Sequence, residues 1–162
     1  MKLFKILIKL HIVTPRGIFR LAQSFVKEGI TLMALMRFAA KYYPDKTAIV
    51  SESDRLTYKQ LYAKALRLSN ILNQRFSIQK SDNVAVLCRN HTVSALLLPS
   101  LQRLGANTKF INTDYAEQNI RDIISRKKFK LLIFDEDFEQ KIPTEFRHLS
   151  KEIQVADFRR GF

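Results

Sequence analysis

The feature that most constrains the fold is an alternation of short apolar runs with helical patterns along most of the chain. Residues 84–88 and 131–134 are unbroken apolar runs of strand length, which is typical of strands buried on both faces of a sheet. Between them, apolar residues recur three and four positions apart, which predicts helices. Strands joined by single helices favour right-handed crossovers, so we expect an α/β fold with a mostly parallel sheet and flanking helices.

Further elements follow from the same patterns. Residues 47–51 and 55–57 read as short strands, and residues 108–111 and 153–158 read as two more. The helix expected at residues 92–104 is apolar nearly all round, so we expect it to be buried.

Capping signals mark where two helices start. Thr57 and Gln60 have the spacing of a capping box, which predicts a helix directly after the second short strand. Asp114 and Glu117 are interpreted as the cap of a later helix.

The chain divides into two parts by composition. Residues 1–45 read as a basic helical N-terminal extension, and residues 46–162 as the α/β domain. Within the extension, one helix is expected at residues 18–28, ended by Gly29, and another at residues 31–43.

Charge is concentrated at the start of the chain. The formal net charge is +13, and residues 1–46 hold nine basic residues against two acidic ones. Such a surface attracts anionic partners. Nucleic acid is the least favoured of these, because the basic residues form no known reading motif.

The first residues have the pattern of an amphipathic helix. Lys2, Lys5 and Lys9 share one helical face and interrupt the apolar stretch, which excludes a signal peptide and a spanning helix. This face can lie on an anionic membrane surface, or the helix can pack on its own domain or on a partner subunit. The single cysteine, Cys88, is interpreted as a small buried side chain and indicates a reducing compartment, so we expect a cytoplasmic protein that associates with membranes.

The residue types needed for catalysis are not assembled in this sequence. The chain has four glycines, too far apart to write any phosphate-binding glycine loop, and its three histidines lack metal-ligand spacing. We therefore assign no catalytic residue, no metal site and no cofactor to the chain alone.

Polar residues at two strand ends are the candidate binding residues. Arg89, Asn90 and His91 follow the strand at 84–88, where open α/β sheets bind ligands, although Asn90 or His91 could instead cap the next helix. The acidic run at residues 135–137 could hold Mg²⁺, but a solvated turn that starts a short helix is favoured.

A series of motifs in order resembles the start of the AMP-forming acyl-CoA synthetases. The motifs are YPDK at residues 43–46, RLTY at 55–58, KSD at 80–82, RNH at 89–91, LGA at 104–106, INT at 111–113 and LLIFD at 131–135. The resemblance covers about residues 16–142. Two residues depart from the family pattern: Ser81 replaces a glycine, and Pro99 lies inside a buried helix.

The resemblance implies a truncated or split ligase that retains only part of the first subdomain of the adenylate-forming fold. The complete enzyme would use ATP, Mg²⁺ and CoA to convert a fatty acid into its CoA thioester, and the fragment alone is expected to be inactive. Its expected partner is the missing C-terminal part of the ligase. The alternative is a non-catalytic module that binds a lipid surface or a protein.

Overall fold

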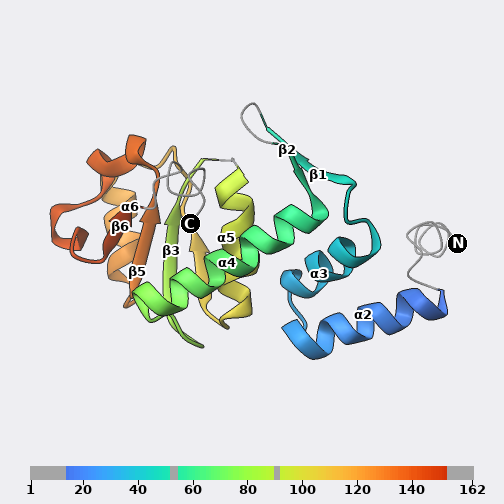
Figure 1. Cartoon of the computed structure of the whole chain (residues 1–162). Coiled ribbons are helices and arrows are strands. Elements are labelled where there is room, and N and C mark those ends of the chain that lie inside the picture. Colours follow the sequence, from blue (N-terminus) through green and yellow to red (C-terminus); the bar gives the residue numbers. More distant parts are fainter. Residues whose placement is uncertain (1–13, 52–54, 90–91, 153–162) are drawn as a thin grey trace, which may run out of the picture. The chain divides into compact units, whose positions relative to one another are not determined.

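The computed structural model describes residues 14–51, 55–89 and 92–152. It divides into two compact units, Met1–Leu66 and Arg67–Phe162, whose elements are labelled in Figure 1. The boundary between a basic extension and an α/β domain, predicted between residues 45 and 46 from the composition of the sequence, stays a prediction.

The described part of the first unit includes two helices, a small hairpin and the start of a third helix. Helix α2 (Pro15–Glu28) ends at Gly29, as predicted, where the backbone takes a positive φ of 70°. It begins three residues earlier than predicted, because proline fits the first helical position, where no amide donor is needed. The Thr14 hydroxyl caps it by accepting the Gly17 N–H at 3.0 Å.

Helix α3 (Leu32–Tyr42) and strands β1 (Thr47–Val50) and β2 (Arg55–Thr57) follow. The two strands pair antiparallel. Helix α4 (Tyr58–Phe76) starts at the predicted capping box. Thr57 N–H donates to Gln60 Oε1 at 2.9 Å, and Gln60 N–H donates to Thr57 Oγ1 at 3.3 Å.

The second unit is built on a parallel sheet. Its strands are β3 (Asn83–Leu87), β4 (Asn107–Phe110), β5 (Leu131–Phe134) and β6 (Ser150–Glu152), in the order β4-β3-β5-β6. Every neighbouring pair in this sheet is parallel, which confirms the predicted α/β class. The strand predicted at residues 153–158 lies outside the described residues.

Helices connect the strands on both sides of the sheet. Helix α5 (Thr92–Arg103) joins β3 to β4, and α6 (Glu117–Ser125) joins β4 to β5 in the opposite direction (Figure 1). Right-handed crossovers in opposite directions place their helices on opposite faces. Two short 3₁₀ helices, Glu136–Lys141 and Thr144–Phe146, follow β5.

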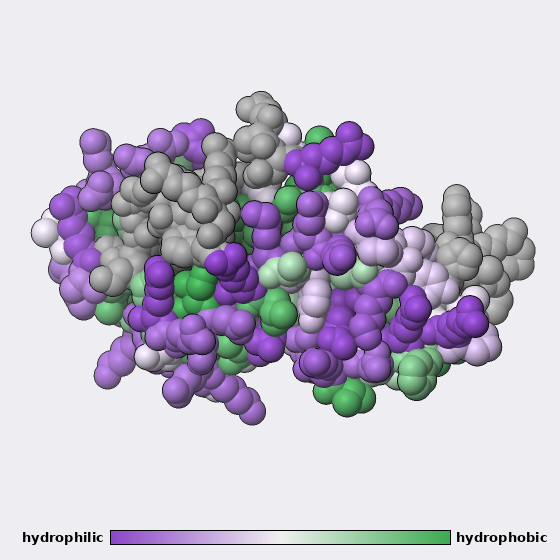
Figure 2. Space-filling view, in the orientation of Figure 1, coloured by the Kyte–Doolittle hydropathy of each residue, from purple (hydrophilic) through white to green (hydrophobic). Residues whose placement is uncertain are grey.

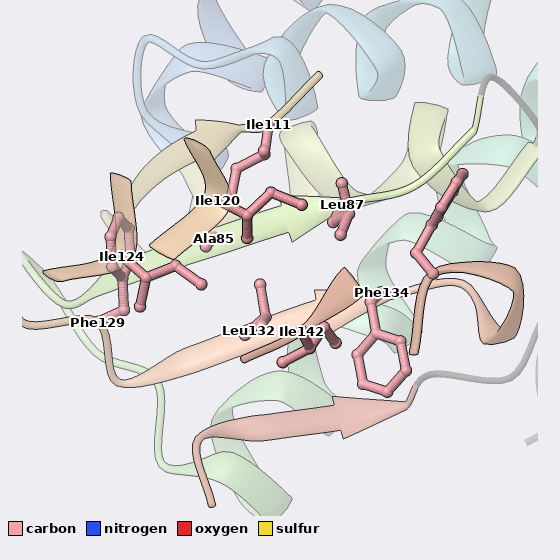
Figure 3. Packing of buried hydrophobic residues seen from close by; sticks show 10 residues of the cluster. Ala85, Leu87, Ile111, Ile120, Ile124, Phe129, Leu132, Phe134 and Ile142 are labelled. Carbon is pink, nitrogen blue, oxygen red and sulfur yellow. The ribbon is translucent and has the colours of Figure 1, made fainter. Parts of the chain in front are cut away.

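The core on the α6 side is a cluster of aliphatic and aromatic side chains. Ile120 and Ile124 of α6 point toward Ala85, Leu87 and neighbouring residues of the sheet (Figure 3). β3 and β5 are buried along nearly their whole length, as the apolar runs predicted.

Two local predictions need correction. Helix α6 is not capped by Asp114 and Glu117: its N-cap is Ala116, which makes no side-chain capping bond, and Asn112 Oδ1 instead accepts the Asp114 N–H at 3.0 Å. Helix α5 is buried on most sides, but Ala95 is exposed.

Lys2, Lys5 and Lys9, predicted to lie at a membrane surface, are outside the described residues. In the part of the chain that the structure describes, no helix combines the length and apolar character needed to cross a membrane.

Candidate functional site at the carboxyl edge of the sheet

The two central strands, β3 and β5, form the topological switch point of the sheet. They are neighbours, yet the chain leaves β3 toward β4 on one side and leaves β5 toward β6 on the other. Loops that leave in opposite directions open a crevice at the carboxyl ends of such strands, where α/β folds bind ligands. Arg89 and Asp135 lie at these two ends.

Hydrogen bonds tie the two strand ends together. The Arg89 backbone N–H donates to Asp135 Oδ2 at 2.7 Å, and the Asp135 backbone N–H donates to the Leu87 carbonyl at 3.2 Å. The Asp135 carboxylate therefore holds the backbone at the start of the loop after β3.

Two cations lie beside one aromatic ring at this edge. The Arg89 guanidinium carbon lies 5.4 Å from the centre of the Phe138 ring, and Lys141 Nζ lies 5.7 Å from the same centre. Lys141 Nζ also donates to the Thr113 carbonyl at 2.7 Å, which connects the segment after β5 to the loop after β4. We name Arg89, Phe138 and Lys141 the edge cluster.

An ion pair partly neutralises the edge cluster. Arg89 Nη2 lies 3.2 Å from Asp137 Oδ2, and both side chains are about two-thirds exposed. Exposed pairs of this kind contribute little to stability and exchange readily with other ions. The arrangement can therefore present a guanidinium to an anionic ligand.

The Cys88 thiol is kept in its neutral form. Burial raises its pKa, and the nearby Asp135 carboxylate raises it further. Its Sγ lies 4.0 Å from the Ile133 carbonyl, and the residue is half-buried rather than fully buried. A neutral thiol is a poor nucleophile, so Cys88 is not activated for chemistry; the prediction of a buried side chain holds only in part.

The structure describes one of the three predicted binding residues. Arg89 lies exposed at the end of β3, whereas Asn90 and His91 are outside the described residues. No pattern in the sequence points directly to Phe138 and Lys141. The segment after β5 could still be expected near Arg89, because the carboxyl ends of neighbouring parallel strands meet at the same edge of the sheet.

The acidic run after β5 begins a 3₁₀ helix at Glu136, which is the turn that the sequence favoured over a metal site. Among the described residues, no group of three or more His, Cys, Asp or Glu side chains could hold a metal ion. The described glycines also fail to fit a triphosphate: Gly17 lies within α2, and Gly29 and Gly105 close helices.

Comparison with known proteins shows which family the chain resembles. Residues 36–159 match the model of the family described as AMP-binding enzyme.

Two curated relatives match at moderate identity. A 2-succinylbenzoate–CoA ligase of Listeria innocua is 31% identical over 99 residues, which is 61% of this chain and 21% of that protein. A medium/long-chain-fatty-acid–CoA/3-oxocholest-4-en-26-oate–CoA ligase of Mycobacterium tuberculosis is 26% identical over 114 residues, 70% of this chain and 21% of that protein. The chain thus spans about a fifth of the length of these relatives.

The fold is shared with a solved structure. O-succinylbenzoate coenzyme A synthetase from Bacillus subtilis, in complex with ATP and magnesium ion, superposes with a TM-score of 0.66 at 22% identity. The match covers 78% of this chain and 34% of that one.

Proposed function

The chain belongs to the AMP-binding enzyme family, and on that premise we propose that it is the first part of an AMP-forming CoA ligase that acts on fatty acids. The observation that carries the proposal is a match over residues 36–159 together with a parallel sheet whose switch point exposes Arg89. The match takes in every described element from α4 to β6.

The complete enzyme would make a thioester in two steps. The fatty-acid carboxylate attacks the α-phosphorus of ATP, forming acyl-adenylate and releasing pyrophosphate. The CoA thiol then attacks the acyl carbonyl, and AMP leaves. ATP, Mg²⁺ and CoA are assigned to the complete enzyme, because the Bacillus subtilis structure holds ATP and magnesium ion and the two curated relatives are named as CoA ligases.

Within that enzyme, this chain would contribute binding surface rather than reacting groups. Arg89 and Lys141 place positive charge at the carboxyl edge of the sheet, and the Phe138 ring lies beside both cations. An anionic ligand that approaches the switch point would meet Arg89 in competition with Asp137.

Fatty acid is the proposed substrate class, and an aryl acid is the rival. The Mycobacterium tuberculosis relative is named for medium- and long-chain fatty acids, and the Listeria innocua relative for 2-succinylbenzoate. The order of motifs, with RNH at residues 89–91 followed by INT at 111–113, supports the fatty-acid branch.

ATP–pyrophosphate exchange tests the proposal in two arms. The purified chain alone is expected to give no exchange with fatty acids or with 2-succinylbenzoate. A chimera that carries residues 36–159 in place of the matching segment of the Mycobacterium tuberculosis relative is expected to retain exchange with fatty acids. The unmodified relative is the positive control.

Exchange by the chain alone would show that it is catalytically complete. A chimera that melts cooperatively like its host yet catalyses no exchange would show that the segment is not an equivalent subdomain. That result would favour the second candidate, a module that binds a lipid surface or a protein, which the basic first 46 residues support. The cytoplasmic, membrane-associated location likewise remains a proposal.

A further inference from the structure

Helix α2 exposes the side chains that a helix ordinarily buries. Its buried residues include Gly17, Ser24 and Glu28, whereas Ile18, Phe19 and Val26 are 56%, 68% and 89% exposed. A helix packed on its own protein ordinarily turns its apolar stripe inward. This inversion indicates that the outer face of α2 contacts something else.

The exposed apolar side chains of α2 form one stripe. Because successive helical residues turn by about 100°, Ile18, Phe19, Ala22 and Val26 fall within about 100° of arc. We name these four residues the α2 stripe. Figure 2 shows apolar surface over α2 at the lower edge, next to hydrophilic surface.

Exposed basic side chains lie beside the stripe. By the same geometry, Arg16 and Lys27 fall on the arc next to Phe19, and both are exposed. Arg20 lies there too, but its guanidinium donates to the Lys41 carbonyl at 2.9 Å. The adjacent arc therefore presents positive charge outward.

Negative charge is absent from this surface. Glu28 is the one acidic residue in the sequence between residues 14 and 44. Its side chain is 1% exposed, accepts the Tyr62 hydroxyl at 2.6 Å and pairs with Arg37 at 3.7 Å. The exposed charges of α2 and α3 are all cationic as a result.

These features fit one occupant. We propose that the outer face of α2 docks on an anionic lipid surface, with Ile18, Phe19 and Val26 entering the headgroup region and Arg16 and Lys27 facing lipid phosphates. An apolar stripe bordered by cations is the pattern of helices that lie in a membrane interface. A nucleic acid would use the cations and leave the stripe exposed to water.

Helix α2 lies outside the segment that matches the family. The family match begins at residue 36, after α2 has ended. The inference is therefore independent of the proposed ligase function, and it concerns residues other than Lys2, Lys5 and Lys9.

Vesicle flotation of the full 162-residue chain tests the inference. The vesicles are phosphatidylcholine alone and an equal mixture with phosphatidylglycerol. The chain is expected to float with the mixture and far less with the neutral lipid. Phe19→Gln with Val26→Gln should lower binding about tenfold or more, because both apolar side chains lose their burial.

The chain offers a matched control. Phe110→Gln with Val50→Gln removes the same two residue types at exposed positions in β4 and β1, and should leave binding unchanged. Arg16→Gln with Lys27→Gln should lower binding to the mixture by roughly fivefold per charge and leave the weak neutral binding alone. Far-UV circular dichroism checks that every variant is folded.

Several results would overturn the inference. One is a Phe19→Gln, Val26→Gln variant that floats like the unsubstituted chain. Another is loss of flotation on removing residues 1–13 with no effect of the α2 substitutions, which would assign lipid contact to that segment. Self-association that depends on Phe19 and Val26 without vesicle binding would assign the face to a second copy, and duplex DNA binding without vesicle binding would assign the cations to nucleic acid.

Discussion

At the scale of single residues, the backbone explains one departure from the family pattern. Ser81, which replaces a glycine, has a positive φ of 70°, a conformation that costs a residue with a Cβ about 1–2 kcal/mol. Its N–H donates to the Gly105 carbonyl at 2.9 Å, which holds the turn before β3 in place. The family's glycine suits this backbone, and this chain accommodates the strain.

Substitution Ser81→Gly should stabilise the second unit. Relief of the left-handed strain outweighs the added entropy of glycine in the unfolded chain, so the free energy of unfolding should rise by about 0.5–1 kcal/mol. Urea unfolding followed by circular dichroism measures it. Gly105→Ala should do the opposite, since φ is 72° there and a Cβ would lie 3.1 Å from Lys80 Cγ. A less stable Ser81→Gly variant would contradict this account of the turn.

Acid should weaken a second contact in the same region. The hydrogen bond from Lys130 Nζ, at 2.7 Å, and then that from the Gln79 N–H hold the pKa of Asp82 below its ordinary 3.8. Because the pKa is lower in the folded chain, the stabilisation is present above pH 3.8 and is lost as pH falls through the folded value.

Replacing Lys130 with Met removes the larger cause of this shift. The variant should be less stable than the unsubstituted chain near neutral pH, and the difference should shrink as the pH falls below 3.8. Unfolding free energies at a series of pH values measure the difference. Lys128→Met, at an exposed neighbouring position, is the control. A stability difference that does not vary with pH would show that Asp82 is not the titrating group.

At the scale of elements, the packing of α2 on α3 depends on a buried charge. Glu28 at the end of α2 joins Arg37 of α3 and Tyr62 at the start of α4. Among the described atoms, Arg37 Nε is buried without a hydrogen-bond partner. The Glu28 carboxylate is therefore the group that offsets the cost of burying the Arg37 guanidinium. A buried cation left without its partner is costly.

Glu28→Ala should therefore destabilise the first unit by about 3–5 kcal/mol. Glu28→Gln should cost less, because an amide oxygen can still accept the Tyr62 hydroxyl. Glu117→Ala is the matched control: it breaks an exposed pair with Arg121 and should cost less than about 1 kcal/mol. Urea unfolding measures all three. Equal effects for Glu28→Ala and Glu117→Ala would show that burial of the pair is unimportant.

Elements with a local cause could be predicted from the sequence, whereas contacts between distant residues could not. The apolar runs of β3 and β5 and the capping box of α4 are local signals, and the structure confirms them. The contacts of the buried Glu28 and those of the edge cluster form between segments far apart in the sequence. No local sequence pattern therefore predicts them. Of the candidate site, Arg89 was found because it follows a recognisable strand.

At the scale of the whole molecule, the chain is a folded α/β segment of a ligase family that spans about a fifth of its curated relatives. Its sheet ends in a switch point able to present cations, while the sequence has no glycine-rich loop to hold a triphosphate. We therefore expect this segment to fold by itself and to need further polypeptide for adenylation.

One titration tests both halves of that claim. Amide ¹H–¹⁵N correlation spectra of the 162-residue chain are recorded while ATP and Mg²⁺ are added. We predict a dispersed spectrum, since the segment folds its own core, and no saturable shift of any amide resonance. A collapsed spectrum, or saturable shifts gathered at a set of residues of this chain, would contradict the account.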